Sequence, residues 1–170
     1  MRSLLLLTLV AGCDVGSLPN GSVGGGDGGT TDPNACVARG TAPPEHVHAA
    51  GGTTNAGMNC MDGVACHAAG GAGGAYSAAG TVYKNDGTTP NPGAVVRIKN
   101  GTQVLTTITD TAGNFRFIQA TQPITFPAQT DVSACPDQVP MVTPLQTGQG
   151  SCAMAGCHVA GVQGPVMFQN

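Results

Sequence analysis

The chain has 170 residues, of which 9% are charged and 4% aromatic, and it carries a formal net charge of −3 with no tryptophan. Only six residues are Lys or Arg, and they form no basic patch, which excludes nucleic-acid binding by phosphate neutralisation. Because 27 residues are glycine, the remaining apolar residues suffice for the core of only one small domain. Crosslinks would help to stabilise such a small core.

The N-terminal residues have the layout of an export signal. Arg2 precedes a short apolar run over residues 4–10, which is too short to span a bilayer. The sequence Val10-Ala11-Gly12-Cys13 follows and resembles the lipobox of bacterial lipoproteins. That resemblance implies removal of residues 1–12 and a lipid on Cys13, which anchors the chain to a bacterial membrane in the periplasm or at the cell surface. A plain secretory signal with cleavage elsewhere is the alternative.

Two segments without regular structure are expected next. Residues 13–35 are rich in Gly, Ser, Asn and Pro and form a flexible linker with a reach of roughly 25 Å. Residues 36–77 form a Cys/His-rich loop region with little strand or helix signal, apart from short helical turns near Cys66.

Residues 78–134 change character and predict a β-sandwich core. Strands separated by turn signals are expected at 80–83, 94–99, 104–109, 115–117 and 130–134. In the second strand, Val96 and Ile98 share one face and Arg97 and Lys99 the other. Asn100-Gly101 is a strong signal for the hairpin that follows. Residues 135–170 form a C-terminal Cys/His segment with a last strand.

The sandwich segment resembles a known family. Gly80-Thr81-Val82, Pro92-Gly93-Ala94 and the run from Thr109 to Phe117 (TDTAGNFRF) are similar to carboxypeptidase regulatory-like, or transthyretin-like, domains. The resemblance covers about a third of the chain and implies a small all-β, Ig-like sandwich that serves as an accessory or display module. It implies no peptidase activity, and the sequence has no paired carboxylates or nucleophile elbow. We therefore expect a protein that is not an enzyme.

Two cysteine pairs are each followed at once by a histidine. The first is Cys60-X5-Cys66-His67 and the second is Cys152-X4-Cys157-His158, one at each end of the predicted sandwich. Both motifs resemble the haem-attachment sequence of c-type cytochromes, in which two thiols add to the vinyl groups and the adjacent histidine binds iron. The resemblance implies up to two covalent haems, with His67 and His158 as proximal ligands.

Each haem iron would need a second axial ligand or an open position. The remaining histidines, His46 and His48, are the first candidates, and ligation by two imidazoles favours electron transfer over oxygen chemistry. Four methionines are alternative donors: Met58, Met61, Met154 and Met167. The low aromatic content predicts solvent-exposed haems, which would exchange electrons with a redox partner protein.

Two other interpretations remain open. In the first, an exported chain forms disulfides at Cys60–Cys66 and Cys152–Cys157, and the protein is a disulfide-stapled structural or binding module at the cell surface. In the second, zinc, copper or nickel binds to Cys and His residues, including the Glu45-His46-Val47-His48 segment. If cysteines that are close in the sequence pair with each other, Cys36 and Cys135 form a further disulfide. This disulfide is compatible with all of these interpretations.

Overall fold

We describe the fold from a computed structural model of the chain. The described residues are 32–48, 55–63, 66–158 and 164–168, so the predicted export signal, Cys13 and most of the predicted linker lie outside them. Within these ranges the chain is all-β, as the sequence predicts. Its strands are β1 (Tyr76–Tyr83), β2 (Val95–Asn100), β3 (Gln103–Ile108), β4 (Asn114–Ile118), β5 (Gln129–Ala134), β6 (Asp137–Pro140) and β7 (Val166–Met167).

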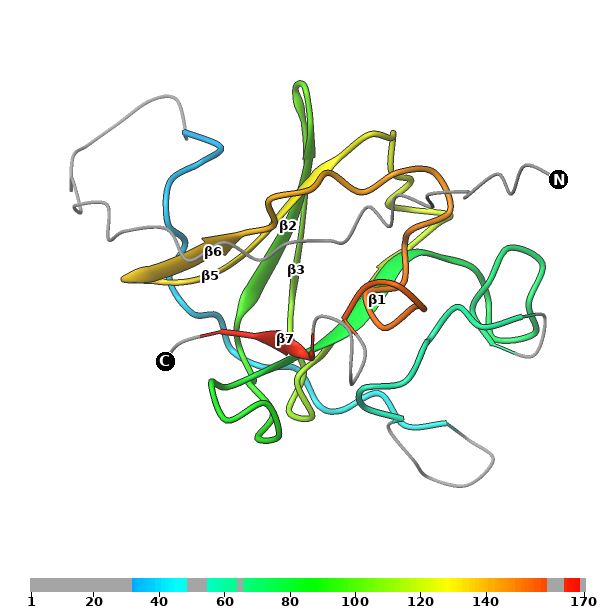
Figure 1. Ribbon diagram of the computed structural model, residues 1–170, viewed down its shortest axis with the longest axis horizontal. Helices are drawn as coiled ribbons and strands as arrows, with labels where there is room; N and C mark the ends of the chain where they lie inside the picture. The colour runs from blue at the N-terminus through cyan, green and yellow to red at the C-terminus, as the bar shows by residue number, and fades with distance from the viewer. Residues whose placement is uncertain (1–31, 49–54, 64–65, 159–163, 169–170) are drawn as a thin grey trace, which may run out of the picture.

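The strands form two sheets (Figure 1). One sheet has the order β4-β1-β7 and the other has the order β3-β2-β5-β6. β1 is antiparallel to β4 and parallel to the short β7, while the four strands of the second sheet are all antiparallel. No helix in the described part of the chain has the length and apolar character needed to cross a membrane.

The core lies between the two sheets and comes from alternating strand residues. Phe115 and Phe117 point inward from β4 on either side of the half-buried Arg116, as the alternation predicts. Val82 from β1 meets Val96 and Ile98 from β2 in the same apolar cluster. Burial of these side chains is the main stabilising contribution of the sandwich.

The opposite face of β2 is covered by the segment that leads into the domain. Arg97 is 4% exposed and donates to Asp131 on β5 at 2.8 Å, and Lys99 lies 2.5 Å from the same carboxylate. Arg97 also donates to the carbonyl of Ala35, and Lys99 to the carbonyl of Pro33. The predicted alternation of β2 is therefore confirmed. Its two charged side chains form ion pairs and are covered by the preceding segment of the chain.

A disulfide joins this covering segment to the sheet. Cys36 is bonded to Cys135, which follows β5, with 5.6 Å between their Cα atoms. The backbone N–H of Cys135 donates to the carbonyl of Val37 at 3.0 Å, so backbone and side-chain links coincide. The predicted Cys36–Cys135 pairing is confirmed.

The β2–β3 hairpin differs from the prediction by one residue. Asn100 pairs with Gln103 inside the ladder, so the two turn residues are Gly101 and Thr102. Gly101 has a φ of 54°, a conformation that glycine adopts without steric cost. Glycine at the first turn position suits the right-handed twist of the paired strands.

Candidate functional site

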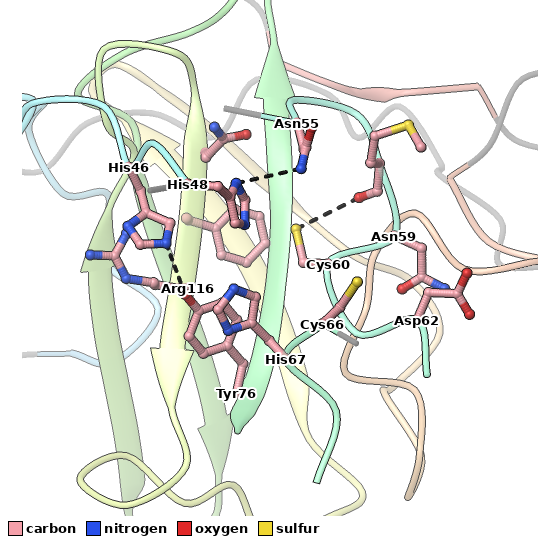
Figure 2. A pocket seen from close by; sticks show the side chains of 13 residues that line it. His46, His48, Asn55, Asn59, Cys60, Asp62, Cys66, His67, Tyr76 and Arg116 are labelled. Atoms are coloured by element: carbon pink, nitrogen blue, oxygen red, sulfur yellow. Dashed lines mark hydrogen bonds between the residues drawn. The ribbon is translucent and has the colours of Figure 1, made fainter. Parts of the chain in front are cut away.

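Three histidines from two separate segments of the chain meet beside the start of β1 (Figure 2). His46 and His48 come from the segment before the sandwich, and His67 comes from the first Cys-His motif. The ring centroids are 5.5 Å apart for His46–His48, 6.1 Å for His46–His67 and 5.9 Å for His48–His67. One nitrogen from each ring lies within 4.8 Å of the other two, which is close enough for a shared ligand.

His67 is the most firmly held of the three. Its ring stacks on Tyr76 with centroids 3.8 Å apart and planes 5° from parallel, and its backbone carbonyl accepts from Tyr76 N–H at 2.9 Å. Its Nδ1 is 2.9 Å from the carbonyl oxygen of Gly74, so Nδ1 carries the proton and Nε2 is left as an acceptor. A side chain at Gly73 would come within 2.6 Å of the ring, so only glycine fits there.

His46 and His48 are positioned through polar contacts. The backbone N–H of His46 donates to Asp110 Oδ2 at 3.0 Å, and the other oxygen of Asp110 caps the turn before β4. The Nε2 of His46 lies 3.4 Å from the Tyr76 hydroxyl. His48 Nδ1 lies 3.4 Å from the side-chain amide of Asn55. The turn and β1 therefore fix where His46 enters the site.

These rings line a pocket of about 240 Å³ that also contains both thiols of the first motif. Cys60 and Cys66 are partly buried and are not bridged to each other. Burial raises the pKa of the Cys60 thiol, with a smaller contribution from Cys66, so the protonated form is favoured. Burial lowers the pKa of His46, and the positive charge of Arg116 lowers it further, which favours the neutral imidazole that binds metals.

The two Cys-His motifs close with the same backbone hydrogen bonds despite their different lengths. His67 N–H donates to the carbonyl of Cys60 at 3.0 Å, and His158 N–H donates to the carbonyl of Cys152 at 2.9 Å. The backbone N–H of the second cysteine in each motif donates to the carbonyl of the residue three positions before it. The internal repeat seen in the sequence is therefore also a repeat of local structure.

The second motif lies farther along β1 and has a different environment. Cys152 N–H donates to the carbonyl of Ala79, and Ala79 N–H donates to the carbonyl of Gly150. Cys157 is buried, and the Nδ1 of His158 is buried without a hydrogen-bond partner among the described residues. Burial lowers the pKa of His158, and the nearby backbone of Gly164 opposes this shift in part. The described part of the motif does not line the histidine pocket.

The structure thus brings together His46, His48, His67, Cys60 and Cys66, and leaves Cys152, Cys157 and His158 apart. Among the four methionines, only Met58 lines the pocket, and it is 63% exposed. Tyr76, Asn55 and Arg116 also contribute and were not predicted. Of these three, Arg116 has the clearest signal in the sequence, because it lies between Phe115 and Phe117 in a predicted strand and alternation turns it away from the core.

No protein family, curated protein or solved structure matches this chain.

Proposed function

We propose that this chain is an extracytoplasmic, lipid-anchored redox protein that holds a covalent haem at its first Cys-His motif. Cys60 and Cys66 would attach the porphyrin, His67 would be the proximal ligand, and His46 or His48 would be the second axial ligand. One observation carries the proposal: both thiols, the adjacent histidine and the two other candidate ligands line one pocket.

The donor set of the pocket fits a c-type haem. Cys60 and Cys66 would each hold the porphyrin through a carbon–sulfur bond, made by addition of the thiol S–H across one vinyl group. Two unbridged thiols are needed, and Cys60 and Cys66 meet that requirement. A proximal histidine commonly donates its second ring N–H to a carbonyl, and His67 does so to Gly74.

The residues around the pocket suit electron transfer. A bound haem would supply one-electron chemistry at its iron, which His67 together with His46 or His48 would hold. Tyr76 and Gly74 fix the orientation of His67, and Asp110 fixes the backbone of His46. The cavity of about 240 Å³ is smaller than most cofactor pockets, so a porphyrin edge would stay exposed to a partner redox protein.

The second motif supports a haem less well than the first. Its histidine has a buried Nδ1 and its second cysteine is buried, so a porphyrin would require local rearrangement. We therefore assign one haem to the first motif. The experiment described next also tests for a second haem at Cys152, Cys157 and His158.

A pyridine haemochrome spectrum tests the proposal. The chain would be expressed with its own export signal in a bacterium that makes c-type cytochromes. We expect a haemochrome band in the wild-type protein, its loss in the C60S/C66S variant, and its retention in C152S/C157S. A colourless wild-type protein would overturn the proposal and leave the alternative, a non-catalytic module displayed at the surface and held by the Cys36–Cys135 disulfide.

A further inference from the structure

We propose that His46, His48 and His67 also form a binding site for a single divalent late transition-metal ion in chains that carry no haem. The site uses the histidines of the proposed haem pocket but requires neither thiol. It therefore shares histidine ligands with the haem proposal but goes beyond it, because it does not depend on Cys60 or Cys66.

The ring nitrogens are already gathered. One nitrogen from each histidine lies within 4.8 Å of the other two, and metal–nitrogen bonds of about 2.0–2.1 Å place ligating nitrogens of one ion at comparable or shorter separations. His46 and His48 are one residue apart in an extended segment, whereas His67 approaches from a different loop. An ion at this point would link the segment before the sandwich to the first Cys-His loop.

The supporting contacts favour ligation over simple packing. The carbonyl of Gly74 accepts a hydrogen bond from His67 Nδ1–H, which leaves the lone pair on Nε2 for a metal. His67 itself is 7% exposed and cannot turn easily, because it lies between Tyr76 and the backbone at Gly73. A buried ring held in one tautomer and facing two other imidazoles matches the usual arrangement of a metal ligand.

The donor set selects the class of ion. Three imidazole nitrogens suit Zn²⁺, Cu²⁺, Ni²⁺ and Co²⁺, whereas Mg²⁺ and Ca²⁺ prefer oxygen ligands. Three protein ligands leave a further position for water, as in open zinc sites. The charged lining residues, Arg116 and Asp62, are opposite in sign, so they do not add a net repulsion for a cation.

Calorimetric titration of Zn²⁺ into the full chain tests this site, with the absorption spectrum of bound Co²⁺ as a second readout. The C60S/C66S variant is the starting protein, because it cannot attach haem at this motif and keeps all three histidines. We expect one ion per chain, and we expect His48→Ala to weaken binding by about a hundredfold or more, since loss of a ligand exceeds the usual effect of its supporting partners. His158→Gln is the matched control and should bind normally.

The outcomes separate the two proposals. His67→Ala provides a second variant, and thermal unfolding without metal shows whether each variant is folded. If folded C60S/C66S binds no Zn²⁺, or if His48→Ala and His67→Ala bind it as tightly as their parent, the metal site is wrong and the haem proposal is unaffected. A colourless wild-type protein that binds one Zn²⁺ through these histidines would support the site and reject the haem.

Discussion

At the scale of single residues, the histidine pocket depends on one aromatic side chain that is itself no ligand. Tyr76 stacks on His67, and its hydroxyl lies 3.4 Å from His46 Nε2. It therefore touches two of the three rings from one position at the start of β1. The stacked face sets the plane of His67, while the hydroxyl contact affects only His46.

Substitutions at Tyr76 should separate these two effects. Tyr76→Phe keeps the stacked ring and should leave the Zn²⁺ affinity of the C60S/C66S chain within a few-fold of its parent. Tyr76→Leu removes the stacking that fixes His67 and should weaken Zn²⁺ binding by roughly tenfold to a hundredfold, the usual range for residues that orient a metal ligand. Calorimetry measures both, and equal affinities in the two variants would show that stacking has no positioning role.

The lowered pKa of His46 predicts a dependence on pH. A histidine whose pKa is lowered in the folded state stabilises the fold above its unfolded pKa of 6.5, and this contribution is lost as the pH falls through the lower folded value. In the haem-free C60S/C66S chain, histidine NMR should show a midpoint for His46 below 6.5. Acidification from about pH 7.5 to about pH 5 should destabilise this chain more than the same chain with His46→Gln in urea unfolding. A midpoint above 6.5 would contradict the assignment.

Part of the site could be predicted from the sequence. The Cys-His spacing indicated His67, Cys60 and Cys66, because a ligand next to a thiol is a local pattern. The role of Tyr76 could not be predicted, because stacking depends on how the loop folds back onto β1. The backbone contact of His46 with Asp110 could not be predicted either, because it joins residues that are distant in the sequence.

At the scale of elements, the segment before the sandwich has two roles. It covers the charged face of β2 through the Ala35 and Pro33 carbonyls, and it continues to His46 and His48. Five strands were predicted to within a few residues because they alternate and are bounded by turns. Within residues 135–170 one last strand was predicted without bounds, whereas the structure has β6 and β7, whose four and two residues are too few to show a period.

The disulfide should secure this segment to the sheet. The Cys36→Ala/Cys135→Ala variant should lose about 2–5 kcal/mol of unfolding free energy, since the bond closes a long loop with a sequence separation of 99. Urea unfolding monitored by circular dichroism measures the loss. The C152S/C157S variant serves as a comparison for removal of two cysteines. Unchanged stability in Cys36→Ala/Cys135→Ala would show that the other contacts of the segment suffice.

At the scale of the whole molecule, β1 supports both Cys-His motifs. Tyr76 at the start of β1 contacts the first motif, and Ala79 is hydrogen-bonded to the second motif. The two motifs therefore contact β1 at positions three residues apart. They also approach each other directly, because the side chain of Met61 lies against Gly150. The sandwich thus supports two loops of similar local structure, of which only the first opens into the histidine pocket.

The most direct test of the redox proposal is the intact mass of the mature protein, purified from membranes of a bacterium that makes c-type cytochromes. We predict a chain that begins at Cys13, carries lipid and one haem, and lacks the two hydrogens of the Cys36–Cys135 disulfide. The C60S/C66S variant should lose the haem mass and keep the lipid. A wild-type mass with lipid but without haem would contradict the proposed function.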